Sequence, residues 1–104
     1  MLIRLVRMTI APDRRTDFLA LFDSVSPSIR SHIGCHHLEL WQDVRYPNVL
    51  TTYSLWENED ALNAYRNSDV FIDSWQQARR MFAAEPETMS FSRCRSVAEP
   101  AQLA

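Results

Sequence analysis

Aromatic side chains recur between residues 53 and 82, and their types suit the walls of a pocket for a flat organic molecule. Rings exclude water and stack on other rings, so several rings facing a sheet can hold an aromatic ligand. The same spacing also fits the packed core of a small domain, and both interpretations stay open. The candidate wall residues are Trp56, Tyr65, Phe71, Trp75 and Phe82.

Four side chains that can donate or accept protons are expected beside these rings. The phenols of Tyr53 and Tyr65 can donate hydrogen bonds, the imidazole of His37 can act as a base near neutral pH, and the guanidinium of Arg7 can only donate. We therefore predict that Tyr65, His37 and Trp56 are catalytic. The residues predicted to bind a small aromatic ligand are Arg7, Tyr53, Phe71, Trp75 and Phe82.

The composition excludes several classes of protein. All eleven basic residues are arginine, and without lysine the chain has neither a Schiff-base lysine nor the lysine of a P-loop. The formal net charge of −2 gives no general attraction to nucleic acid or to an anionic membrane, so we expect neither as a partner. No signal peptide precedes the first predicted strand and no apolar run approaches about 18 residues. These features predict a cytoplasmic, reduced protein in which Cys35 and Cys94 are buried thiols.

The histidine-rich run from His32 to His37 looks at first like a metal site. Successive residues of a strand point to opposite faces, so His36 and His37 cannot share an ion unless the strand is bulged. No cluster of carboxylates and histidines with zinc spacing occurs elsewhere in the sequence. We therefore predict no metal, with the histidines on the surface or partly buried.

The first half of the chain is predicted to begin with a strand and a helix. Nearly continuous apolar character over residues 2–10 indicates a strand covered on both sides. Pro12 suits a first helical turn, and apolar residues at helical spacing over 18–29 indicate an amphipathic helix. Pro27 should kink its last turns, and Gly34, the only glycine, should form a left-handed cap after it.

The middle of the chain is predicted to form a hairpin and a broken helix. Alternating polarity over residues 35–44 and β-branched and aromatic residues over 49–57 indicate two paired strands. A second helix should begin after the capping residue Asn58 and end near Ala84. Within it, Ser68 can cap a restart after a break.

A last strand over residues 87–97 completes the order strand, helix, strand, strand, helix, strand. This order is that of the ferredoxin-like βαββαβ fold of the α+β class, an antiparallel four-stranded sheet with two helices on one face. Residues 1–97 are then one domain and 98–104 a flexible C-terminal tail. Because two helices cover only one side of a sheet that is apolar on both, we predict a homodimer with the sheets packed face to face.

Four short motifs stand at the junctions of these predicted elements: Gly34-Cys35, Ser54-Leu55-Trp56, Glu59-Asp60-Ala61-Leu62 and Ser68-Asp69-Val70-Phe71. On these motifs, and from Met1 to about Arg95, the sequence resembles the antibiotic biosynthesis monooxygenase family of dimeric α+β barrels. That family includes quinol and anthrone oxygenases, haem-degrading enzymes and many members without known function.

The resemblance implies a cofactor-independent monooxygenase that acts on an aromatic, phenolic or quinone-like small molecule. In oxygenases of this fold the deprotonated substrate itself gives an electron to O₂, without metal or flavin. The protein then needs a dry cavity lined by rings, a hydrogen-bond partner for the phenolate and access for oxygen.

The sequence departs from the better-defined branches of the family. Many quinol-oxidising members carry His where this chain has Tyr65 and Val70, and a Glu where it has Ser54. The haem-degrading branch uses Asn, Trp and His where this chain has Val6, Tyr65 and Trp75, so haem degradation is not expected. The missing histidines keep a second interpretation open, a non-catalytic ligand-binding or stress-response dimer of the same fold. A third is a structural dimer with a filled core.

Overall fold

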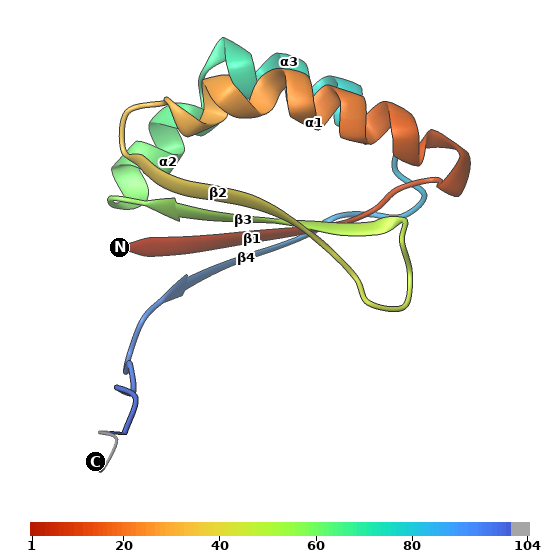
Figure 1. The fold of residues 1–104 in the computed structure, drawn as a ribbon. Coiled ribbons are helices and arrows are strands. Elements are labelled where there is room, and N and C mark those ends of the chain that lie inside the picture. The colour runs from red at the N-terminus through yellow and green to blue at the C-terminus, as the bar shows by residue number, and fades with distance from the viewer. Residues whose placement is uncertain (101–104) are drawn as a thin grey trace.

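The computed structural model describes residues 1–100, which form a four-stranded antiparallel sheet with all helices on one face (Figure 1). The strands lie in the order β2-β3-β1-β4, which is the ferredoxin-like α+β arrangement predicted from the sequence. In chain order the elements are β1 (Leu2–Thr9), the 3-10 helix η1 (Pro12–Arg14), α1 (Arg15–Arg30), β2 (Cys35–Gln42), β3 (Val49–Trp56), α2 (Glu59–Arg66), α3 (Asp69–Arg79) and β4 (Glu87–Ser92).

Two capping side chains divide the predicted second helix into α2 and α3. The Asn58 side chain accepts a hydrogen bond from the backbone N–H of Ala61 at 2.8 Å, and α2 begins one residue after Asn58. The Ser68 hydroxyl accepts one from the backbone N–H of Phe71 at 3.3 Å and begins α3. Both caps are confirmed. Each satisfies an N–H group that has no partner within its own helix.

Two elements end earlier than predicted, and in each case the reason is the pairing with β1. α3 ends at Arg79 rather than near Ala84 because the chain turns back, and the N–H of Ala83 donates to the carbonyl of Thr9 at 2.8 Å. β4 ends at Ser92 because this residue already pairs with the first residue of β1. Residues 93–97 therefore lie outside the predicted strand.

The turn from α1 into β2 also differs from the prediction. α1 continues through Pro27 to Arg30, and Ser31 caps it in a right-handed conformation. Gly34 does adopt a left-handed conformation, with φ +86°, but it lies in the turn into β2 and not at the helix cap. A side chain at this position would also meet α2, because a Cβ atom on Gly34 would lie 2.5 Å from that of Ala61.

The helix side of the sheet carries the core. Side chains alternate along a strand, so the even-numbered residues of β1 and β3 face the helices. They form two buried clusters, one around Met8, Ile10, Phe18, Leu50, Ala78 and Met81, and the other around Cys35, Trp56, Leu62 and Tyr65.

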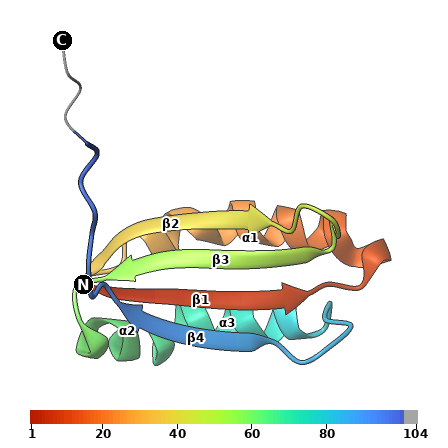
Figure 2. The ribbon, with the colours of Figure 1, turned by 90° about the horizontal axis from the view of Figure 1, so that it is seen from below.

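No helix lies over the opposite face of the sheet (Figure 2). We call it the open face. Among its residues Trp41 is 43% exposed, Met89 37% and Phe91 48%. Ile3 and Leu5 of β1 pair with Phe91 and Met89, so this strand carries apolar residues on both faces. Within residues 1–100 only its helix face is covered, and the predicted cover on both sides stays a prediction.

The chain leaves the sheet after Ser92 (Figure 1). Cys35 is buried as predicted, but Cys94 is exposed because it lies beyond the end of β4. Residues 101–104 of the predicted tail 98–104 lie outside the described residues. Among residues 1–100 no helix combines the length and the apolar character needed to cross a membrane.

Candidate functional site

A cavity of about 110 Å³ lies between the helices and the sheet. For comparison, a dry apolar cavity of about 150 Å³ holds one benzene molecule. The lining is almost wholly apolar. It consists of Phe18, Leu21, Phe22, Val25 and Ile29 from α1, Val6, Met8 and Thr52 from the sheet, and Tyr65, Phe71, Ser74, Trp75 and Ala78 from α2 and α3.

A second cavity of about 220 Å³ adjoins the first. Val6, Phe71 and Trp75 line both cavities and so form the wall between them. We call the two cavities together the helix-side site. Ligand pockets usually measure roughly 300–1,000 Å³, so the two cavities must be used together to hold a ring system. The other residues around the second cavity are Arg4, Leu62, Arg66 and Thr88.

Tyr65 contributes a phenol side chain to the lining of the apolar cavity. Its side chain is only 9% exposed and stacks on Trp56 with ring centroids 4.9 Å apart. Phe71 meets it edge-on at 5.3 Å. Burial first, and the neighbouring Cys35 second, raise the pKa of the Tyr65 phenol to about 12. At neutral pH the hydroxyl is therefore protonated and can donate a hydrogen bond, and within residues 1–100 it donates none.

Two of the predicted wall residues do not line the cavity and instead pack against rings that do. Trp56 is 1% exposed, and its indole N–H donates to the buried Ser54 hydroxyl at 3.0 Å. Phe82 meets Trp75 edge-on at 5.6 Å. Of the five predicted walls, Tyr65, Phe71 and Trp75 line the cavity, and these two hold the lining rings in place.

Three predicted site residues lie on the open face instead. His37 and Tyr53 lie edge-on to each other at 5.7 Å, and Arg7 pairs with Glu87 at 3.6 Å. The expectation that these residues lie beside the aromatic pocket is therefore wrong. The reason is the alternation of the strands, because odd-numbered residues of β1 and β3 point away from the helices.

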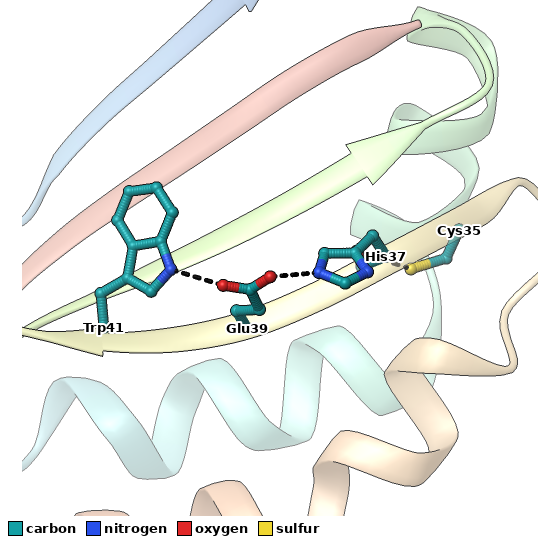
Figure 3. A network of polar contacts seen from close by, with 4 residues as sticks. All are labelled: Cys35, His37, Glu39 and Trp41. Atoms are coloured by element: carbon teal, nitrogen blue, oxygen red, sulfur yellow. Dashed lines mark hydrogen bonds and ion pairs between the residues drawn. The ribbon is translucent and has the colours of Figure 1, made fainter. Parts of the chain in front are cut away.

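On the open face, His37 belongs to a polar network along β2 (Figure 3). The Glu39 carboxylate pairs with the His37 imidazole and accepts a hydrogen bond from the Trp41 indole at 2.8 Å. The hydrogen bond from Trp41, followed by that from His37, lowers the pKa of the Glu39 carboxyl group. Trp41 also stacks on Tyr53 with ring centroids 4.8 Å apart.

The pairing of β2 with β3 is irregular at His36. Cys35 pairs with Trp56 and His37 with Leu55, so His36 is an extra residue in a bulge. A bulge here is the condition under which His36 and His37 could have shared a metal ion. Even so, no group of three or more His, Cys, Asp or Glu side chains able to hold a metal forms in the part of the chain described.

Three contributions to the site were not predicted. α1 supplies much of the lining, although its apolar stripe was recognised only as a helix face. Arg4 and Arg66 line the larger cavity. The His32 ring packs edge-on against Tyr65 at 5.5 Å. Alternation along β1 puts Arg4 on the same face as Val6 and Met8, but the sequence does not show that this face meets the helices.

A model of the antibiotic biosynthesis monooxygenase family matches residues 1–74, which is more than half of the chain. The chain belongs to this family. The match includes Tyr65 and Phe71, both of which line the cavity. A search of curated proteins finds no significant match.

Solved structures share the fold of this antibiotic biosynthesis monooxygenase family member. A conserved protein from Methanosarcina mazei Go1 aligns with a TM-score of 0.83 and 23% identity, covering 88% of this chain and 91% of that one. A structure described as an antibiotic biosynthesis monooxygenase aligns with a TM-score of 0.86 and 16% identity, covering 91% of this chain and 100% of that one. Rv0793 from Mycobacterium tuberculosis aligns with a TM-score of 0.84 and 18% identity, covering 93% of this chain and 98% of that one. At these identities the likeness establishes the fold.

Proposed function

We propose that the protein is a monooxygenase that oxidises a small aromatic, phenolic or quinone-like molecule with O₂ in the helix-side site. The observation that carries this proposal is Tyr65, whose side chain lines a cavity of mostly apolar residues and whose phenol stays protonated at neutral pH. A donor fixed in a mostly apolar site stabilises a developing oxyanion more strongly than the same donor in bulk water. Tyr65 would bind the phenolate oxygen of the substrate, and so favour the form that can reduce O₂.

The reductant in the proposed reaction is the substrate. The bound phenolate passes one electron to O₂, and the resulting radical and superoxide combine at an activated carbon to give a peroxide. In an anthrone-like substrate, loss of water from the peroxide then converts the activated methylene group into a carbonyl. One oxygen atom enters the product, and the other leaves as water with the two methylene hydrogens. The apolar lining keeps bulk water from the intermediates.

Binding without catalysis is the second candidate function. Among residues 1–100 the lining of the smaller cavity contains no carboxylate and no imidazole, so these residues offer no side-chain base there to deprotonate a phenol. The catalytic proposal therefore requires a substrate acidic enough to ionise with help from Tyr65 alone. A ligand-binding or stress-response protein would need only the cavity.

Oxygen consumption distinguishes these two functions. We expect uptake of O₂ with at least one compound in a panel of hydroquinones and anthrones, unchanged by a chelator. With an anthrone as substrate and isotopically labelled O₂, mass spectrometry should find one labelled oxygen atom in each product molecule. Tight binding of the same compounds without any O₂ uptake would refute the monooxygenase and favour the binding protein.

We further propose that a second copy of the chain covers the open face. Phe91 and Met89 leave apolar surface in water there next to Ile3 and Leu5, and Trp41 does so on β2. A large contiguous apolar patch on a soluble protein is usually an interface. The same surface on a twin molecule is complementary under twofold symmetry, and it would bury these side chains against their own kind.

Replacing Phe91 by glutamate is expected to separate the proposed dimer, because a carboxylate would be buried in an apolar interface. Sedimentation velocity should show wild-type dimers and Phe91→Glu monomers, a weakening of at least about 100-fold if the charge costs about 3 kcal/mol. The matched control is Ile33→Glu, since Ile33 is exposed in the turn before β2. It should remain dimeric. A monomeric wild-type protein would refute this proposal.

A further inference from the structure

Two arginine side chains border the larger cavity of the helix-side site. Arg4 comes from β1, and Arg66 is the last residue of α2. Both line the same space as the rings of Phe71 and Trp75. An aromatic surface and two cationic groups therefore face one cavity, so any ligand there meets both.

Neither arginine is neutralised within residues 1–100. In this part of the chain the side chain of Arg4 makes one hydrogen bond, to the Ser90 hydroxyl at 3.0 Å, and Arg66 pairs with no carboxylate. Three other arginines do have acidic partners: Arg7 with Glu87 at 3.6 Å, Arg14 with Asp17 at 3.0 Å and Arg79 with Glu85 at 3.5 Å.

Without a bound anion, the two positive charges at this cavity destabilise each other. Burial first, and the charge of Arg66 second, lower the pKa of Arg4. A half-buried guanidinium close to a like charge is stabilised when an anion enters between the two groups. The overall charge of the chain is −2, so this attraction is a local property of the cavity.

We propose that Arg4 and Arg66 bind a carboxylate on the ligand, while its aromatic body lies against Phe71 and Trp75. The planar fork of a guanidinium matches the two oxygens of a carboxylate and can donate to both. This assignment deepens the proposed function, because it uses the same site and defines the substrate class as an aromatic carboxylic acid. The carboxylate would fix which end of the ring system points toward Tyr65.

Two ligands of nearly equal shape test the assignment by isothermal titration calorimetry on the full chain. Naphthoate carries the carboxylate, and naphthamide replaces it with a neutral amide. We expect naphthoate to bind about 10- to 100-fold more tightly, which is the range for charge-assisted hydrogen bonds. The advantage should shrink as the salt concentration rises, because the arginines are partly exposed.

Variants of the pair identify the groups responsible. Arg66→Gln and Arg4→Gln should each weaken naphthoate binding about 10-fold and leave naphthamide binding unchanged. Arg66 is exposed, so its variant keeps the fold intact, whereas Arg4 is half-buried and its variant needs a melting curve. The matched control is Arg45→Gln, because Arg45 is exposed in the turn between β2 and β3. This control should bind both ligands as the wild type does.

The outcomes separate this inference from the proposed function. Equal binding of both ligands, unchanged in Arg66→Gln, would overturn the arginine assignment and leave the aromatic cavity standing. Failure of both ligands to bind the wild type would overturn both proposals. If Arg4→Gln loses stability, Arg66→Gln decides alone.

Discussion

The substitution Gly34→Ala is expected to lower the free energy of unfolding by about 2–5 kcal/mol. The left-handed backbone at Gly34, with φ +86°, costs an alanine about 1–2 kcal/mol. The added methyl group would lie 2.5 Å from the Cβ of Ala61, and overpacking of this kind costs about 1–3 kcal/mol more. α2 cannot easily move away, because its residues Leu62 and Tyr65 are buried. Chemical denaturation monitored by circular dichroism measures the loss.

A double-mutant cycle with Ala61→Gly separates the two causes. Ala61→Gly alone should cost about 1 kcal/mol of helix stability. In the double variant the clash disappears and only the backbone strain of alanine at position 34 remains, so the two changes should cost less together than the sum of the single losses. Strict additivity would show that the contact with Ala61 has no part in the effect. A loss below about 1 kcal/mol in Gly34→Ala would contradict the whole argument.

The substitution Tyr65→Phe is expected to reduce turnover about 100-fold while leaving the melting temperature nearly unchanged. Removing one donor from an oxyanion site typically costs a factor of about 100 to 1,000 in rate. Stability should survive because the hydroxyl has no hydrogen-bond partner within residues 1–100, and phenylalanine keeps the ring contacts with Trp56 and Phe71. The rate is measured as O₂ uptake with the best compound of the hydroquinone and anthrone panel.

Tyr46→Phe is the matched control for the Tyr65 experiment. Tyr46 is exposed between β2 and β3 and loses the same hydroxyl group in this variant. Its turnover should equal that of the wild type. If Tyr65→Phe instead unfolds at a much lower temperature and turns over normally per folded molecule, then Tyr65 is a core residue without a catalytic part.

The elements and their order could be predicted from the sequence because their signals are local. Asn58 and Ser68 are short polar residues directly before helical patterns, and both act as the caps that this position favours. The end of α3 could not be predicted in the same way. Residues after Arg79 turn back to pair with β1, and that contact joins segments far apart in the sequence.

The rings of the site were partly predictable, and the polar groups were not. Tyr65, Phe71 and Trp75 recur at spacings that bring them to one side of the helices, and they line the cavity. For the arginines, a strand that is apolar on both sides gives no sign of which face meets the helices. Arg7 was therefore selected from β1, although Arg4 is the residue that borders the cavity. The cavity itself could not be predicted, because it depends on how three helices and the sheet pack against one another.

The alternation of β1 limits how the length of this strand can vary. Its even residues line the interior chamber and its odd residues form the outer surface, so deleting one residue would exchange the two sets beyond that point. Apolar side chains such as Leu5 would then enter the chamber, and Val6 would turn outward. Insertions and deletions are consequently tolerable in the loop before Val49 or after Ser92, whereas the register of β1 has to stay fixed.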